Sequence, residues 1–341
     1  MAISANAFSP KEFELGIGQE STCGTVKVDA LIGVNIDSVS FPTLNPTQVL
    51  DVRNHSGRVA QDIDVFLSKA QTVKEISFSG VLDTQIAPYL IEGCIGSATS
   101  DAGEANKLFQ ILDTYSPGEI AYGTTSGDRA FTYTVAVISP TSGKSITIPG
   151  MVFTSVSFSA DMGEEGGRYK FEATMQSGKS ANFDATAAIA TDYTANYYSL
   201  GDSTVRTVAG VADNLIQSVS LSIENPANFH GFSGNDFEIV SRAIPEISVN
   251  SDVTMKYDSQ SLELDSQFGG AQTAAGLMTV IGTNAAIESA TDGKFNFEIA
   301  HSVVTNFAFN EAAAMMVDVS LKGLADPSAS NHDKAALSIK I

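Results

Sequence analysis

Two Gly-Lys-Ser tripeptides, at 143–145 and 178–180, come closest to a nucleotide-binding motif. A phosphate-binding loop needs another glycine five residues before the Gly-Lys pair, so that backbone amides surround the phosphate, and an amphipathic helix after it. Those earlier positions hold Ile138 and Ala173, and no such helix follows. The Gly-Ile-Gly stretch at 16–18 lacks the third glycine of a dinucleotide-binding loop and follows no convincing strand. We interpret both tripeptides as turns at strand ends.

The side chains that most often act as acids, bases or metal ligands are scattered. Glu164 and Glu165 are adjacent, but neighbouring residues in a strand or turn point apart, which favours a solvated turn. Cys23 and Cys94 fit no metal-ligand spacing, so we expect free thiols in a protein made in a reducing cytoplasm. No two of the four histidines are close enough for a helical metal pair; they are His55, His230, His301 and His332. The sequence therefore predicts no catalytic residues, no cofactor and no metal ion, and a protein that is not an enzyme.

The composition favours a β-rich protein that does not grip DNA. The 341 residues are 43% hydrophobic and 17% charged, enough for two ordinary domains or one large β-domain. Acidic residues outnumber basic ones by 39 to 19, so the net charge is −20. A DNA-binding protein gains affinity through lysine and arginine contacts to phosphates, and this balance argues against one. No secretory signal and no membrane-spanning apolar run are expected.

Apolar and polar residues alternate along most of the chain, as they do in strands with one buried face. The clearest case is a long hairpin, with strands at 152–159 and 169–175 and its turn at 161–167. Further strands are predicted at 131–137 and 247–257. One flanking helix is predicted from the spacing of Ala105, Leu108, Phe109 and Leu112, with Asp101 and Glu104 as its cap and Pro117-Gly118 as its stop.

Four short echoes in the same order predict an internal repeat. Segments 37–41, 75–78, 154–158 and 171–175 are echoed by 217–221, 246–249, 305–309 and 317–321, respectively. The first echo continues to an Asn-Pro pair at the same spacing, at 45–46 and 225–226. We therefore expect two copies of one β-domain, at 26–178 and 212–324, joined by a linker at 179–211. An N-terminal arm (1–25) and a C-terminal tail segment (325–341) flank them.

Two segments resemble the major tail tube proteins of long-tailed bacteriophages (siphophages). Residues 16–25, Gly-Ile-Gly-Gln-Glu-Ser-Thr-Cys-Gly-Thr, resemble a Gly-x-Glu-Ser/Thr-x-x-Gly-Thr stretch near the start of those proteins, with Cys23 where an aromatic residue is frequent. Residues 217–226, followed by the strand at 246–257, are similar to their middle. The resemblance implies a mainly β (β-rich α+β) fold of two tandem β-sandwich or half-barrel domains, each with a long hairpin and a flanking helix.

The resemblance also implies a function. Such proteins assemble with themselves into stacked rings, and the tube that results is the conduit through which DNA is ejected. Rings of this family contain six domains, so a chain with two domains implies a homotrimeric ring with pseudo-sixfold symmetry. The implied partners are other copies of the chain and the tail terminator, tape-measure and tail-tip proteins. DNA would pass an acidic lumen without specific binding, and the protein would be assembled in the bacterial cytoplasm and reside in the virion.

The turn of the long hairpin is the segment we expect to contact the next ring. Its tip is acidic and rich in glycine, and it has no large apolar residue except one methionine to bury against its own domain. We therefore expect it to be disordered before assembly and ordered afterwards. The residues are Asp161, Met162, Gly163, Glu164, Glu165, Gly166 and Gly167.

Three other functions remain open from the sequence. A different ring component of the tail, such as a distal-tail or baseplate protein, would use the same fold. A carbohydrate-binding virion β-sandwich is a second alternative, although the chain has no tryptophan and only 8% aromatic residues for stacking on sugars. An enzyme is the third, without a motif to support it.

Overall fold

The structure of the protein is a computed structural model. It describes residues 12–41, 48–50, 65–67, 72–100, 107–127, 130–139, 145–191, 196–211, 215–232, 237–257, 277–282, 295–311, 315–326 and 335–341. Strands make up 59% of the structure and helical residues 7%, which confirms the expected β-rich fold.

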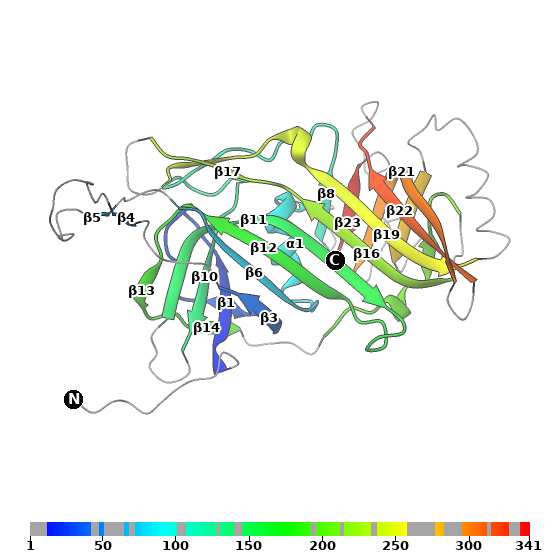
Figure 1. The fold of residues 1–341 in the computed structure, drawn as a ribbon, viewed down its shortest axis with the longest axis horizontal. Coiled ribbons are helices and arrows are strands. Elements are labelled where there is room, and N and C mark those ends of the chain that lie inside the picture. The colour runs from blue at the N-terminus through cyan, green and yellow to red at the C-terminus, as the bar shows by residue number, and fades with distance from the viewer. Residues whose placement is uncertain are drawn as a thin grey trace, which may run out of the picture.

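Eight antiparallel strands form one continuous layer, which we call the long sheet (Figure 1). Because small polar residues alternate with apolar ones along these strands, one face of the layer is polar and the other is apolar. The hairpin predicted at 152–175 lies at its centre and is confirmed. In spatial order the strands are β3 (Ile36–Ser40), β6 (Lys74–Val81), β12 (Lys170–Ser177), β11 (Ser145–Asp161), β16 (Ile216–Glu224), β19 (Ser248–Lys256), β22 (Met315–Gly323) and β21 (Asn296–Glu311).

The two longest strands, β11 and β21, each belong to two layers. The first part of β11 pairs with β10 (Tyr133–Ile138) and β13 (Asn182–Ala185), and β10 continues to β1 (Glu14–Gln19). The first part of β21 pairs in the same way with β20 (Leu277–Gly282) and β23 (Leu337–Lys340), and β20 continues to β15 (Val205–Thr207). Short strands extend these outer layers: β2 (Leu31–Gly33), β14 (Ile189–Thr191), β7 (Thr99–Ser100) and β8 (Lys107–Ile111).

The strand order is therefore the same in both halves of the chain. Each half contributes four neighbouring strands to the long sheet, β3-β6-β12-β11 and then β16-β19-β22-β21. The bulges also agree: the one between Ile36 and Ser38 recurs 180 residues later, between Ile216 and Ser218. The bulge in β11 between Phe153 and Ser155 recurs in β21, 151 residues later, between Val304 and Asn306.

The strand pairing shows whether the echoed segments occupy equivalent positions in the two halves. Three of the four pairs of segments do, and one pair does not. Val39 pairs with Phe78, and the matching Val219 pairs with Val253. The segment 75–78 therefore corresponds to 250–253, and its predicted match with 246–249 is wrong by four residues. A shift of four keeps every side chain on the same face of a strand, so local sequence could not detect it.

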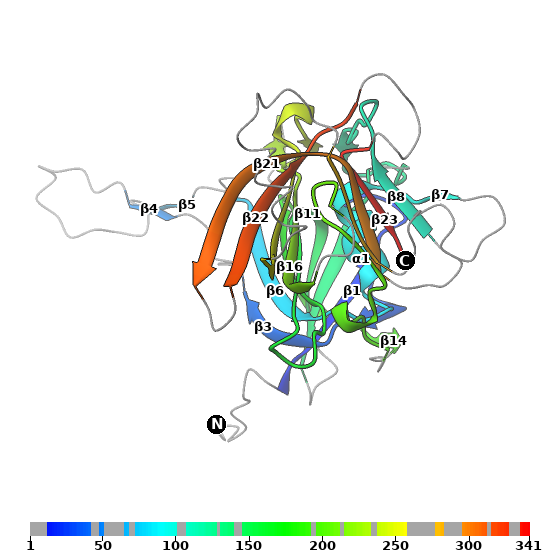
Figure 2. The ribbon, with the colours of Figure 1, turned by 90° about the vertical axis from the view of Figure 1, so that its right-hand side faces the viewer.

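The apolar face of the long sheet is covered by the outer layers and by helix α1 (Ala87–Ile95), which lie behind it in Figure 1 and to its right in Figure 2. The helix follows a turn in which one carboxylate oxygen of Asp83 accepts hydrogen bonds from the amides of Gln85 and Ile86, at 2.8 Å each. It packs on β11 so closely that a Cβ at Gly93 would lie 2.2 Å from a ring carbon of Phe153.

The helix predicted at 105–112 is wrong. Residues 107–111 form strand β8, in which Phe109 pairs with Ile339 of β23; residues 101–106 lie outside the described residues. Strands also occur in the predicted arm (β1), linker (β13, β14 and β15) and tail segment (β23). The 16–18 stretch lies inside β1 and does not follow a strand.

The remaining sequence motifs, the two Gly-Lys-Ser tripeptides and the two cysteines, can be located in the fold. The tripeptide at 178–180 connects β12 to β13, as expected for a turn; of the other, Ser145 begins β11 and the rest lies outside the described residues. Cys23 and Cys94 are buried free thiols, as predicted, and burial raises the pKa of the Cys94 thiol to about 12. Within the described residues, no helix is both long and apolar enough to cross a membrane.

Candidate assembly interface

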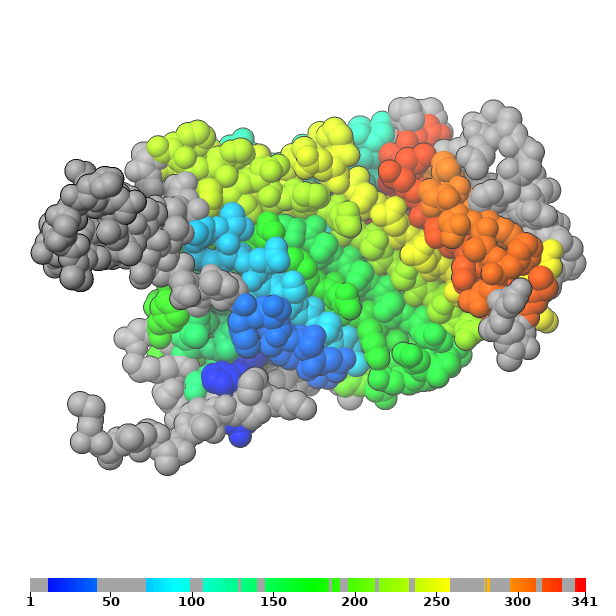
Figure 3. Space-filling view, viewed as in Figure 1, coloured from blue at the N-terminus to red at the C-terminus, as the bar shows by residue number. Residues whose placement is uncertain are grey.

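The polar face of the long sheet is open to solvent and more acidic than basic. In Figure 3 it faces the viewer, and strands of both halves run side by side across it. Serine, threonine and asparagine occupy most of its positions. In the six strands between the two edge strands, its charged side chains are six carboxylates and three lysines: Glu75, Asp161, Glu172, Glu224, Asp252 and Asp318, with Lys170, Lys256 and Lys322.

Hydrogen bonds between neighbouring strands tie these side chains together. The hydroxyls of Ser38 and Ser79 are 2.8 Å apart, and the amide of Gln176 donates to Glu75 at 2.8 Å. In the second half, the hydroxyl of Thr254 donates to Asp318 at 2.6 Å. Some of the carboxylates on this face thus accept hydrogen bonds from neighbouring strands.

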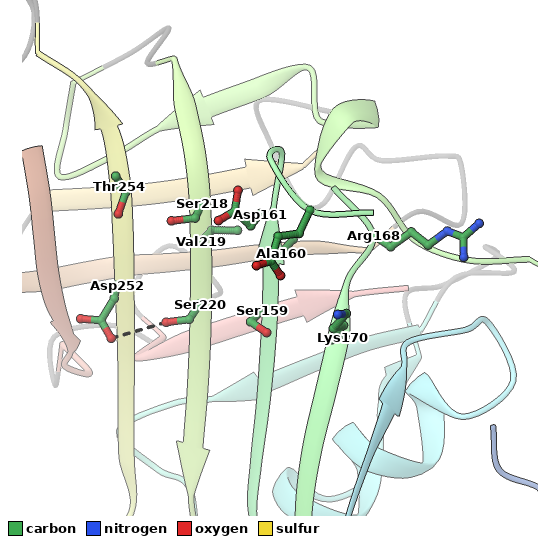
Figure 4. A pocket seen from close by; sticks show the side chains of 11 residues that line it. Ser159, Ala160, Asp161, Arg168, Lys170, Ser218, Val219, Ser220, Asp252 and Thr254 are labelled. Atoms are coloured by element: carbon green, nitrogen blue, oxygen red, sulfur yellow. Dashed lines mark hydrogen bonds between the residues drawn. The ribbon is translucent and has the colours of Figure 1, made fainter. Parts of the chain in front are cut away.

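The polar face has a shallow hollow of about 260 Å³ where the two halves meet, over β12, β11, β16 and β19 (Figure 4). Asp161, Glu164 and Asp252 contribute carboxylates to it, and Asp252 accepts a hydrogen bond from Ser220 at 3.4 Å. Lys170 bonds to Glu165 at 3.1 Å, which raises the pKa of the lysine. The described residues contain no group of His, Cys, Asp or Glu arranged to hold a metal ion.

Both ends of the long sheet are unpaired edges. Among the described strands, β3 pairs only with β6, and β21 beyond its bulge pairs only with β22. Each edge carries an exposed phenylalanine: Phe41, just after β3, is 46% exposed, and Phe309 in β21 is 52% exposed. An open edge with exposed apolar side chains is a surface to which another strand can add.

The junction between the two halves shows how such edges fit together. There β11 pairs with β16, and Phe158 lies opposite Leu221. Both side chains are only 1% exposed, and Phe158 also contacts Phe295, with ring centres 5.2 Å apart. The register makes Phe309 the counterpart of Phe158 and Phe41 the counterpart of Leu221. The two exposed phenylalanines thus occupy the positions whose counterparts, Phe158 and Leu221, are buried at this junction.

The predicted ring-contact loop, 161–167, is held by its own chain. The Met162 amide donates to the Gln217 carbonyl at 2.8 Å, and the Leu200 amide donates to the Gly167 carbonyl at 2.8 Å. The Ser199 hydroxyl adds a bond to the Gly166 carbonyl at 3.3 Å. These partners lie outside the predicted first domain, in the predicted linker and the second half of the chain. The tip of the loop, residues 162–166, is nevertheless exposed.

The histidines do not form a site in the described residues. His230 is exposed in β17 (Asn228–His230) and bonds to Ser241 at 2.8 Å. His301 in β21 lies 3.8 Å from Asp326. His55 and His332 lie outside the described residues.

One functional residue was missed by sequence reasoning: Glu20, the glutamate of the 16–25 motif. Its buried carboxylate accepts hydrogen bonds from the hydroxyls of Thr132 and Thr134, both at 2.6 Å, and from the amides of Gly24 and Gly150, at 2.7 and 3.0 Å. Burial is the main influence on its pKa and raises it. The motif is thus a clamp that joins β1 to β10 and β11.

Comparisons with known proteins agree with this architecture. Residues 14–323, most of the chain, match the family model described as phage tail tube protein. No curated protein matches the sequence. The family is structural, which accords with a surface built of strand edges and hydrogen-bonded polar side chains, and it implies a place in the virion tail. The chain therefore belongs to the phage tail tube protein family.

Proposed function

We propose that this chain is the tube subunit of a siphophage tail and that three copies close into a ring through the free edges of the long sheet. The observation that carries the proposal is the pair of exposed phenylalanines on opposite edges, whose counterparts are buried at the β11–β16 junction. Edge β21 of one copy would pair with β3 of the next. Each chain-to-chain junction would then repeat the junction already present between the halves.

The register of the proposed junction follows from the internal one. Phe158 pairs with Leu221, so Phe309 would lie opposite Phe41 of the next chain. Ser159 pairs with Ser220, so Asn310 would lie opposite Ser40. Apolar residues then meet on the core side and polar residues on the open side, so the polar face continues across the junction. Pairing of both edges removes every unpaired strand from the sheet.

The shared strand order and matching bulges support a tandem duplication. If each half is one tail-tube unit, three chains supply the six units of a ring. The strands β1 and β13 then extend the first unit to 14–185, and β15 and β23 extend the second to 205–340. A long sheet closed in this way has its polar face inside, and the excess of carboxylates there would keep DNA phosphates from binding.

The axial contacts and the ends of the tube complete the proposal. The exposed tip at 162–166 remains our candidate for the contact with the next ring, now as a preformed surface and no longer as a disordered loop. The tape-measure protein would occupy the lumen during assembly in the bacterial cytoplasm. The terminator and tail-tip proteins would cap the two free ring surfaces of the tube.

Cysteine cross-linking tests the ring. A chain that carries both Phe41→Cys and Phe309→Cys has its two cysteines at opposite edges, so oxidation of assembled protein should produce covalent trimers. Facing residues of neighbouring strands are close enough for a disulfide. A control with Phe41→Cys and Phe232→Cys should not form trimers, because Phe232, 73% exposed, lies in the β17–β18 loop. Assembled protein that forms no covalent trimer would refute the proposed pairing.

A further inference from the structure

A pocket of about 300 Å³ opens at one rim of the molecule, and we call it the rim pocket. Three connections meet there: the 3-10 helix η4 (Ile244–Glu246), the chain that follows β8 and the chain that follows β22. Its lining is mainly apolar and includes Ile247 and Val249. Two further lining residues, Ile244 and Leu324, are 54% and 37% exposed, so the described part of the chain leaves them uncovered. An apolar pocket that stays open at the surface is a place where a partner can bind.

The equivalent positions in the first half are polar. The registers of β19 and β6 with the strands before them make Val249 the counterpart of Lys74 and Ile247 the counterpart of Thr72. Two apolar residues of the rim pocket thus stand where the first half has a lysine and a threonine. The second half has an apolar lining that the first half lacks.

The equivalent place in the first half is also filled. Leu324 is the counterpart of Gly178, because β22 pairs with β21 in the register in which β12 pairs with β11. Phe237, in the loop before β18 (Ile239–Ser241), packs on this glycine so closely that a Cβ there would lie 2.5 Å from a ring carbon. Each chain therefore has one rim pocket among its described residues, and a ring of three chains would carry three.

The turn between β11 and β12 presents one apolar side chain from a backbone of fixed shape. The Gly163 amide donates to the Asp161 carboxylate at 2.7 Å, and the Gly167 amide donates to the Glu164 carbonyl at 2.9 Å. The Met162 side chain lies against Gly167, where a Cβ would be 2.7 Å from the sulfur. Met162 is nevertheless 44% exposed. The turn thus holds this methionine in place without burying it.

The rim pocket and this turn lie on opposite faces of the proposed ring. In Figure 1 the two halves lie side by side from left to right, so the axis around which the halves are arranged runs from top to bottom. The segments around the rim pocket lie at the top in both views, and the turn lies at the bottom (Figures 1 and 2). A projecting side chain on one face and a pocket on the other give a head-to-tail contact, which propagates as an open stack.

We propose that the rim pocket binds the Met162 side chain of a second copy of this chain, in the adjacent ring. This rests on the proposed ring and names the surface that receives the tip at 162–166. A methionine side chain is unbranched and flexible, and it fills irregular apolar spaces. The charged lining residues are Lys322 and Asp113, and the exposed Glu164 of the tip would pair with the lysine. Each pair of stacked rings would be joined by three such contacts and not by six.

Cross-linking of assembled tubes with a short bis-maleimide tests the contact. A chain with Met162→Cys and Leu324→Cys should give a ladder of covalent dimers, trimers and longer products, because each copy is joined to a copy in the next ring. The control chain has Met162→Cys and Val73→Cys. Val73 is 42% exposed, about as much as Leu324, and precedes β6 at the equivalent rim of the first half. We expect no ladder from the control; a ladder from both chains, from neither, or from the control alone refutes the proposed contact.

Charge substitutions give a readout that needs no cross-linker. Met162→Asp and Leu324→Asp each place a carboxylate in an apolar contact, so each should raise the critical concentration for tube growth by at least about tenfold. Rings should still form, and Val73→Asp should leave tube growth unchanged. All three positions are exposed, so urea unfolding of the unassembled chain should stay as in the wild type. Normal stacking of both pocket variants would overturn the contact and leave the ring intact, whereas wild-type protein that forms no rings would contradict the proposed function.

Discussion

Truncation of Phe309 to alanine should weaken assembly strongly and folding only slightly. The ring of Phe309 is 52% exposed in the single chain, and its counterpart Phe158 is 1% exposed at the internal junction. Assembly would therefore bury about half of a side chain that hides roughly 200 Å² when fully covered. At about 25 cal/mol per Å², this burial contributes about 2.5 kcal/mol for each chain-to-chain junction.

Within its own chain, Phe309 contacts Tyr257 and Phe307, with ring centres 5.1 and 5.7 Å apart. Each such pair contributes about 0.5–1.5 kcal/mol. Because most of the ring is solvated before assembly, we expect the free energy of unfolding to fall by only about 1–2 kcal/mol. The loss at the junction corresponds to a rise of about 50-fold in the critical concentration.

The assay is sedimentation of assembled protein across a concentration series, with urea unfolding of the unassembled chain as the measure of folding. Phe232→Ala is the matched control, since it removes an equally apolar side chain from an exposed loop away from both edges. The reasoning fails if Phe309→Ala assembles at the wild-type concentration, or if Phe232→Ala impairs assembly to the same degree.

Four further outcomes follow from the same geometry. Glu20→Ala removes the acceptor of four hydrogen bonds, three of them buried, and should lower the free energy of unfolding by about 3–5 kcal/mol in urea. Burial raises the pKa of Glu92, so the folded chain holds this proton more tightly than the unfolded chain and loses stability as pH rises through the folded-state pKa. Glu92→Gln should flatten that dependence at pH values above 4.5, the ordinary pKa of a glutamate. Deletion of residues 163–166 should leave folded protein whose rings form but do not stack, visible by electron microscopy. A gel shift at low salt should show no DNA binding; salt-sensitive binding would contradict the weakly negative lumen.

Strand alternation made the long sheet predictable, because one buried and one solvated face impose a period of two on every strand in it. The hairpin β11–β12 and the strand β19 lie where that period is clearest. The helix was not predictable in this way. The buried residues of α1 do have helical spacing, at Ala87, Leu90, Ile91, Cys94 and Ile95, but Glu92 is the one charged residue in the helix, so the polar face that would mark it in the sequence is weak. The apolar residues of β8 have helical spacing but form a strand. This strand pairs with β23, far along the chain, and Gln110 bonds to Ser338, 228 positions away.

The sequence predicted that the candidate interface involves a repeated domain, but not which residues face each other in it. The echoes indicated a repeat, but the register that makes Phe309 a counterpart of Phe158 depends on bulges and cross-strand pairs that local sequence does not reveal. The clamp at Glu20 shows the same limit: its partners Thr132 and Gly150 lie more than a hundred positions away. The loop at 161–167 was expected to be disordered before assembly from its own acidic, glycine-rich sequence, which does not reveal its hydrogen bonds to Gln217 and Leu200, outside its own hairpin.

Electron cryomicroscopy of the assembled protein tests the central claim most directly. We expect a ring of three chains whose long sheets join into one closed wall, with β21 of each copy beside β3 of the next and Phe309 facing Phe41. The polar face should line the lumen. A ring in which either edge strand stays unpaired, or in which the apolar face of the long sheet is turned to the lumen, would contradict the account.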